Sequence, residues 1–202
     1  MEITHLGNGV VKLANRNFSI LVGPTLPKGA SANVVALTEP NQAAPASEAV
    51  VLDGPGEYEL SGVHITGVAA QLHVDESGQR GTIYAIDSDE VVVACLANIA
   101  PGLSDQQLEA MGQVDVLIIP VGGKGLTLDA TAAAKIVSQV EPHVVIPIHY
   151  DDGKSKYATA QDKVDPFLKE LGAKPEEVTK YKITAKDMPE ETVVVVIKPE
   201  AK

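Results

Sequence analysis

The chain has 202 residues, of which 45% are apolar and 21% are charged, a balance typical of one globular domain with a buried core. Its formal net charge of −11 disfavours binding to the phosphate backbone of nucleic acids, so we expect no nucleic-acid partner. The single cysteine excludes an internal disulfide and a cysteine-rich zinc site, which leaves the five histidines as the main supply of side chains that titrate near neutral pH.

The sequence shows no sign of membrane insertion or export. No stretch approaches the roughly twenty consecutive apolar residues that a membrane-spanning helix needs. The first residues, Met1 to His5, lack the basic and apolar regions of a signal peptide. We therefore expect a soluble cytoplasmic protein with no membrane partner, and the lack of disulfides agrees with a reducing compartment.

The first half of the sequence consists mainly of short aliphatic and β-branched runs separated by turn residues, a pattern that predicts strands. His5 lies in the first of these runs and His64 in a later one with alternating polarity. The sequence Asp53–Gly56 is a strong turn signal between two strands. After the first strand, the expected strands are Val10–Leu13, Phe18–Val22, Asn33–Leu37, Val50–Leu52, Gly62–Val68, Thr82–Asp87 and Glu90–Ala94.

Helix signals begin after residue 100 and alternate with buried strands, an order typical of an α/β domain. Ser104 and Asp129 are predicted N-caps of two helices. Continuous apolar runs in this half predict strands that are buried on both faces. The expected helices cover 104–112, 129–139 and 159–171, and the expected strands cover 114–121, 144–148 and 192–198. With no repeat or linker, we expect a single α/β domain over residues 1–202.

Two loops follow buried strands, and ligands of α/β folds bind at the carboxyl ends of strands. His149 directly follows the 144–148 strand, where it either contributes to a site or makes a structural hydrogen bond. Gly123 and Lys124 follow the 114–121 strand, where glycines let the backbone approach a ligand, although a tight turn alone also explains them. Lys124 precedes a glycine rather than Ser or Thr, so the loop is not a Walker A motif.

The segments 115–123 (DVLIIPVGG), 127–130 (TLDA) and 146–150 (IPIHY) together resemble the metallo-β-lactamase superfamily. The segments 3–7, 53–59 and 187–191 resemble one branch of it, the small metal-dependent hydrolases similar to the ascorbate-phosphate lactonases. The resemblance implies a four-layer αββα sandwich with the site along one edge. It also implies metal ions, held by histidines and an aspartate, that lower the pKa of a bound water.

Most positions that would hold these metal ions carry other residues. The family's His-x-His-x-Asp-His run corresponds to a segment with Glu39 and Asn41 at the first two histidine positions, and Ala43 and Ala44 at the aspartate and the last histidine. Alanine has no atom that can coordinate a metal. Asn98 stands where the family has an aspartate that bridges two metals, and its neutral amide cannot supply that charge.

Only two positions of the implied ligand set keep a histidine, and these are His73 and His149. Asn8 stands in place of the histidine of an early Leu-Gly-His sequence. A catalytic zinc takes about three protein ligands and a water, so two neutral ligands do not normally hold one.

Two hypotheses follow from this pattern. The first is a non-catalytic member of the fold, a binding or structural module without a cofactor, acting on a ligand, a protein partner or a second copy of itself. Its vestigial cleft consists of Glu39, Asn41, Asn98, Gly123 and Lys124. The second is an active zinc-dependent hydrolase of a small ester, lactone or phosphodiester. Its atypical metal site consists of His73, His149, Glu39 and Asp151.

The single cysteine, Cys95, ends the expected strand over residues 90–94. Free cysteines at such positions are commonly buried and inert. The alternative is a nucleophile, but no base lies beside it in the sequence.

Overall fold

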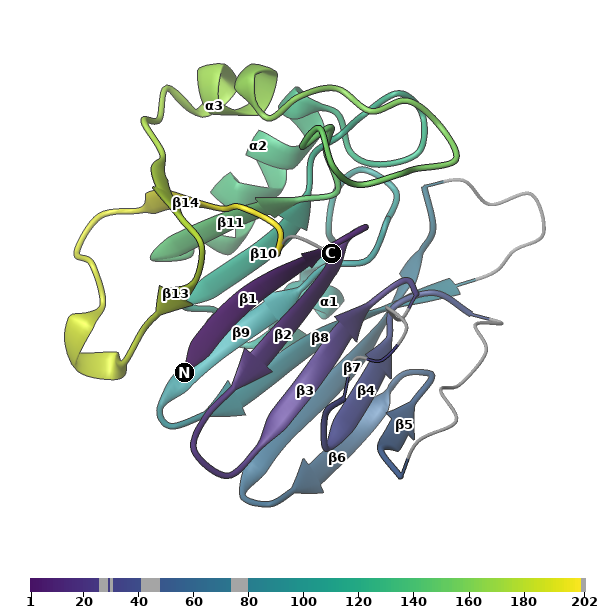
Figure 1. The fold of residues 1–202 in the computed structure, drawn as a ribbon, viewed down its shortest axis with the longest axis vertical. Coiled ribbons are helices and arrows are strands. Elements are labelled where there is room, and N and C mark those ends of the chain that lie inside the picture. The colour runs from purple at the N-terminus through teal and green to yellow at the C-terminus, as the bar shows by residue number, and fades with distance from the viewer. Residues whose placement is uncertain (26–28, 30, 41–47, 74–79, 201–202) are drawn as a thin grey trace.

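The computed structural model describes residues 1–25, 29, 31–40, 48–73 and 80–200. Asn41, Ala43 and Ala44 therefore lie outside the described residues. Within the described part, two mixed β-sheets pack face to face, and α-helices cover the outer face of the larger sheet (Figure 1). This arrangement confirms the α/β class that was expected from the sequence.

The first sheet has six strands and begins as an antiparallel meander. Its members are β1 (Glu2–Gly7), β2 (Val10–Ala14), β3 (Ser19–Gly23), β4 (Val34–Leu37), β5 (Val50–Leu52) and β13 (Tyr181–Lys182). Their order is β13-β1-β2-β3-β4-β5, and β4 and β5 join it in parallel. The chain reaches this sheet a second time with β13, which pairs with β1.

The second sheet has eight strands, in the order β12-β14-β11-β10-β9-β8-β7-β6. They are β6 (Gly56–Leu60), β7 (Val63–Gln71), β8 (Arg80–Ser88), β9 (Val91–Cys95), β10 (Val116–Pro120), β11 (Val144–Ile148), β12 (Glu176–Val178) and β14 (Val193–Ile197). Neighbouring strands in the half β12-β14-β11-β10-β9 are parallel to each other. Neighbouring strands in the half β9-β8-β7-β6 are antiparallel.

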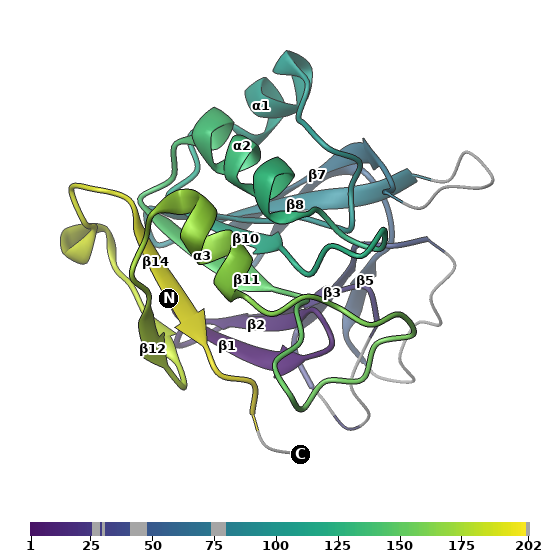
Figure 2. The same ribbon diagram turned by 90° about the horizontal axis from the view of Figure 1, so that it is seen from above.

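The central strands of this sheet are buried on both faces, as their continuous apolar sequences predict. Val116 and Ile118 of β10 point into the core between the sheets, whereas Leu117 and Ile119 pack under the helices. The helices are α1 (Asp105–Met111), α2 (Ala130–Val140), α3 (Asp165–Leu171) and the short 3₁₀ helix η1 (Ala185–Asp187). Figure 2 shows α1, α2 and α3 on the side of the second sheet that faces away from β1 and β2.

The two predicted N-caps are confirmed by their hydrogen bonds. The Ser104 side chain accepts from the backbone N–H of Gln107, and the Asp129 side chain accepts from that of Ala132. Each cap satisfies a backbone donor that the first helical turn leaves free. No helix in the described part of the chain is long and apolar enough to cross a membrane.

The third helix is shorter than expected, because it begins at Asp165 rather than at residue 159. Pro166 stands in its first turn, where proline is tolerated because the N–H it lacks would have no partner within the helix. The preceding residues are also bonded elsewhere, since the Asp162 N–H donates to Gly122 O at 2.7 Å. The short strands β6, β12 and β13 were not expected from the sequence.

Candidate functional site

A carboxyl group and a carboxamide meet where β4 and β9 end. The Asn98 side-chain Nδ2 donates to Glu39 Oε1 at 2.6 Å. Burial raises the pKa of Glu39, and the hydrogen bond from Asn98 opposes that rise. Asn98 is itself only 8% exposed, and its Oδ1 has no hydrogen-bond partner among the described residues.

His73, which follows β7, lies beside this pair. Its backbone N–H donates to Asn98 O at 2.7 Å, and its ring Nδ1 is buried without a partner in the described structure. Gly81 lets β8 approach the backbone at Thr38, next to Glu39, since a Cβ on Gly81 would lie 2.9 Å from Thr38 O. We call Glu39, His73 and Asn98 the Glu39 cluster.

His149 lies at the end of β11 in a second environment. Its backbone has φ +52°, its side chain is 5% exposed, and its ring stacks on Tyr157 with a centroid separation of 4.4 Å and an interplanar angle of 24°. Burial and, to a smaller extent, the positive charge of a protonated His5 lower the pKa of His149 to about 4. The Nε2 atom of His149 is buried and has no hydrogen-bond partner among the described residues.

His5, on β1, lies near this ring. Its Nδ1 is 3.3 Å from Ile197 O, and because a carbonyl only accepts, Nδ1 carries the proton and Nε2 is left as an acceptor. That Nε2 is buried and unpaired within the described residues. Burial also lowers the pKa of His5, whereas the bond to Ile197 and the nearby Asp152 raise it. We call His5, His149 and Tyr157 the His149 cluster.

Tyr157 belongs to residues 151–162, a loop whose first and last residues are hydrogen-bonded to each other. The Asp151 N–H donates to Asp162 O at 2.9 Å, and the Lys124 ammonium pairs with the Asp162 carboxylate at 2.9 Å. A Cβ on Gly122 would collide with His149 O and with the Gln161 side chain, so only glycine fits there. The glycines after β10 therefore make room for this segment of the chain itself.

Gly123 and Lys124, predicted as cleft residues, both contact other parts of the chain. The Gly123 N–H donates to Thr127 Oγ1 at 2.8 Å, and Lys124 is in the ion pair with Asp162. Asp151 is exposed, and its Oδ1 accepts from the Gly153 N–H at 3.1 Å.

The donors in the described residues do not fit the zinc centre that the family resemblance implies. The structure contains, in the parts it describes, no group of three or more His, Cys, Asp or Glu side chains that could hold a metal ion. His73 belongs to the Glu39 cluster and His149 lies under Tyr157. Within the described residues, no hydrogen bond or ion pair joins the two clusters. A catalytic zinc needs about three converging ligands.

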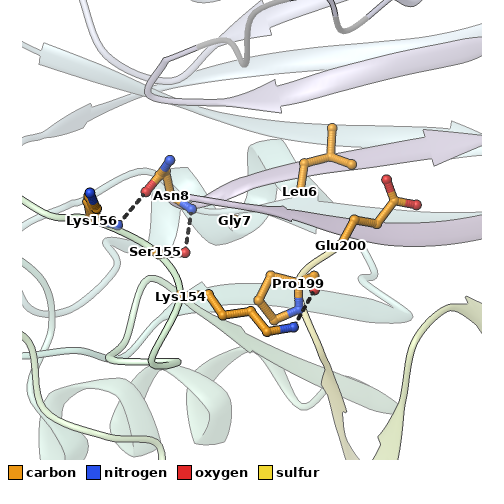
Figure 3. A pocket seen from close by; sticks show the side chains of 8 residues that line it. All are labelled: Leu6, Gly7, Asn8, Lys154, Ser155, Lys156, Pro199 and Glu200. Carbon is orange, nitrogen blue, oxygen red and sulfur yellow. Dashed lines mark hydrogen bonds between the residues drawn. The ribbon is translucent and has the colours of Figure 1, made fainter. Parts of the chain in front are cut away.

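A pocket of about 560 Å³ opens next to the His149 cluster. Its wall is held by Asn8, whose backbone N–H donates to Ser155 Oγ and whose Oδ1 accepts from the Lys156 N–H, both at 3.0 Å (Figure 3). Sequence reasoning missed the pocket because its three segments are far apart in the chain. Its lining residues are Leu6, Gly7, Asn8, Lys154, Ser155, Lys156, Pro199 and Glu200.

Comparisons with known proteins agree with the fold. The sequence profile of the Beta-lactamase superfamily domain matches residues 2–149. A UPF0173 protein of Pyrococcus furiosus is 45% identical over 63 residues, a match that spans 31% of this chain and 27% of that protein.

Solved structures give the same result over nearly the whole chain. A protein of Thermotoga maritima, assigned to the Zn-dependent hydrolases of the metallo-β-lactamase superfamily, is 26% identical with a TM-score of 0.80, covering 98% of this chain and 99% of that one. The metallo-hydrolase Igni18 of Ignicoccus hospitalis is 14% identical with a TM-score of 0.67, covering 99% and 96%. The chain, with this fold and a family match over most of its length, belongs to the metallo-β-lactamase superfamily.

Proposed function

We propose that this hydrolase-like chain is a non-catalytic member of its superfamily, in which the edge that holds metal in related enzymes serves as a binding or structural module. The observation that carries the proposal is the hydrogen bond from Asn98 to Glu39. Both residues stand at positions that the resemblance assigns to metal ligands. In this chain a carboxyl oxygen at that edge accepts from an amide instead.

The chemistry of the Glu39 cluster supports this proposal. The Oε1 atom of Glu39 accepts from Asn98, so one carboxyl oxygen is already engaged by the protein itself, and burial makes the charged form of Glu39 costlier. Asn98 brings a neutral amide rather than a bridging carboxylate. The Oδ1 of Asn98, which has no hydrogen-bond partner among the described residues, instead suits a ligand or partner that donates a hydrogen bond.

The proposal also covers the cofactor, the partners and the cellular location of the protein. We propose that it carries no resident cofactor and acts through a ligand, a protein partner or a second copy of itself. A cytoplasmic location is part of the same proposal, and it is supported by the single cysteine, which is free and buried.

The competing function is an active zinc-dependent hydrolase of a small ester, lactone or phosphodiester. It requires His73, His149, Glu39 and Asp151 to converge on one ion. Among the described residues no group of three or more His, Cys, Asp or Glu side chains could hold a metal ion, so convergence would require part of the chain to rearrange.

Metal analysis of protein purified without chelators tests the proposal. We expect far less than one zinc per chain, no change in His73→Ala or His149→Ala, and no turnover of p-nitrophenyl acetate, a γ-lactone or bis(p-nitrophenyl) phosphate. His64→Ala is the matched control, because His64 is exposed on β7. One tightly bound zinc per chain, lost in His149→Ala and kept in His64→Ala, would overturn the proposal in favour of the hydrolase.

A further inference from the structure

We infer that the 560 Å³ pocket is a binding site for a small organic anion, with a carboxylate or phosphate group near Lys154 and Lys156 and an apolar body against Leu6 and Pro199. We call it the Lys154 pocket. The inference concerns a place other than the Glu39 cluster, and it does not depend on whether the chain binds a metal.

The pocket has the size and construction of a ligand site. Its volume falls in the range of roughly 300–1,000 Å³ that is usual for small-molecule sites. One wall is the backbone of Gly7, with φ +82°, where a Cβ would lie 3.1 Å from Ser155 Oγ. A larger residue at this position would be strained and would press against the segment that carries the lysines.

Charge is the strongest argument for an anion. Lys154 and Lys156 are exposed, and neither has a carboxylate oxygen within 4.0 Å among the described residues. Glu200 is the acidic residue of the lining, and its Oε1 lies 4.0 Å from the Lys180 ammonium, which offsets part of its charge. The lining residues thus include two lysines and one glutamate in a chain whose net charge is −11, and the nearby Asp152 carboxylate is bonded to Ser155 and to the Lys154 N–H.

The backbone that carries the two lysines is fixed before any ligand arrives. Asp152 Oδ1 accepts from the N–H groups of Lys154 and Ser155 at 2.8 and 2.6 Å, and its Oδ2 accepts from Ser155 Oγ at 2.6 Å. These three donors hold the Asp152 carboxylate. Asn8 Oδ1 holds the Lys156 N–H in turn. Preorganisation of this kind reduces the entropy lost on binding.

The apolar part of the lining favours an organic anion over a bare ion. Leu6 and Pro199 are the larger apolar residues of the lining, and Figure 3 shows Pro199 beside Lys154. Lys154 extends across this space until its Nζ lies 3.4 Å from Pro199 O, a long hydrogen bond that an incoming anion can replace. An inorganic phosphate would leave the apolar surface and most of the volume unused.

Calorimetric titration with four probes that share a phenyl ring tests the inference: phenyl phosphate, phenylacetate, 2-phenylethanol and 2-phenylethylammonium. We expect the two anions to bind, more weakly as salt is added, and the neutral and cationic probes to bind at least about threefold more weakly. The tighter of the two anions identifies the phosphate or the carboxylate as the favoured group, and inorganic phosphate alone should bind more weakly than phenyl phosphate.

Variants locate the binding. The double variant Lys154→Ala/Lys156→Ala should weaken binding of the better anion by roughly tenfold, because two nearby cations are removed. The matched control is Lys135→Ala/Lys169→Ala, which removes two exposed lysines on α2 and α3. The inference is wrong if neither anion binds, if the four probes bind equally, or if the control weakens binding as much as the pocket variant does.

Discussion

The Asn98 side chain donates to Glu39 at 2.6 Å across 59 residues of sequence, and the bond joins the two sheets at one edge, since Glu39 follows β4 of the first sheet and Asn98 follows β9 of the second. In a metal enzyme of this fold, an ion held by residues of both sheets would make that connection. In this chain the hydrogen bond from Asn98 to Glu39 makes that connection, beside the bond from the Thr82 N–H to Thr38 O at 2.9 Å.

Asn98→Asp should destabilise the protein in a pH-dependent way. A second carboxyl group within hydrogen-bonding distance of Glu39 makes the pair share a proton, so the pKa of the pair rises in the folded state. A raised folded pKa stabilises at low pH and that stability is lost as pH rises. We expect a loss of about 1–3 kcal/mol in the free energy of unfolding at pH 8 and a much smaller loss at pH 5, measured by urea denaturation.

The control for this change is Asn17→Asp, because Asn17 is exposed. It adds the same charge and should change the free energy of unfolding little at either pH. Equal destabilisation of Asn98→Asp at pH 5 and pH 8 would show that the two carboxyl groups do not interact.

His149 should contribute to the acid sensitivity of the fold. Its pKa is lowered from 6.5 to about 4, so below pH 6.5 the unfolded chain binds a proton that the folded chain does not. The stability that the neutral ring provides is present above pH 6.5 and is lost as pH falls toward 4. His149→Gln should reduce that loss by up to about 3 kcal/mol, whereas the exposed His64→Gln should leave the pH profile unchanged.

Tyr157→Ala should uncover His149. The change removes a stacked ring and should cost about 1–3 kcal/mol of unfolding free energy. Diethyl pyrocarbonate with mass spectrometry should then modify His149 in the variant but not in the native protein, and Tyr181→Ala, a half-buried tyrosine on β13, should leave it protected. Rapid modification of His149 in the native protein would contradict the stacked position of Tyr157.

Cys95 should be inert in the folded protein. Its side chain is 2% exposed, and burial raises the pKa of the thiol, so little reactive thiolate forms at neutral pH. We expect no reaction with Ellman's reagent until guanidinium chloride unfolds the chain, after which one thiol should react. A fast reaction in buffer would favour the nucleophile that the sequence left open.

The parts of the fold that local sequence determines were predicted well. β10 and β11 are continuous apolar runs because both of their faces are buried, and Ser104 and Asp129 cap helices through bonds three residues away. The two-residue strand β13 carries no such signal. It exists because β1 offers an unpaired edge, which is a property of the folded chain.

The candidate sites depend on contacts between distant segments, and the sequence has no pattern for these. Tyr157 stacks on His149 because residues 151–162 fold back on themselves, and His5 lies near both because β1 runs beside the end of β14. The resemblance placed His73 and His149 in one ligand set. In the described residues, no group of three or more His, Cys, Asp or Glu side chains that could hold a metal ion includes them.

The late pairing of β1 has a consequence for synthesis on the ribosome. Tyr181 and Ile3 are register partners, the Ile183 N–H donates to Met1 O, and the Glu200 N–H donates to His5 O. The outer edge of β1 therefore stays unpaired until residues 181–200 have been synthesised, although β2 can pair with its other edge early. In that interval β1 is a strand open to pairing with another nascent chain, so slow translation or crowding of ribosomes on one message should favour aggregation through this edge.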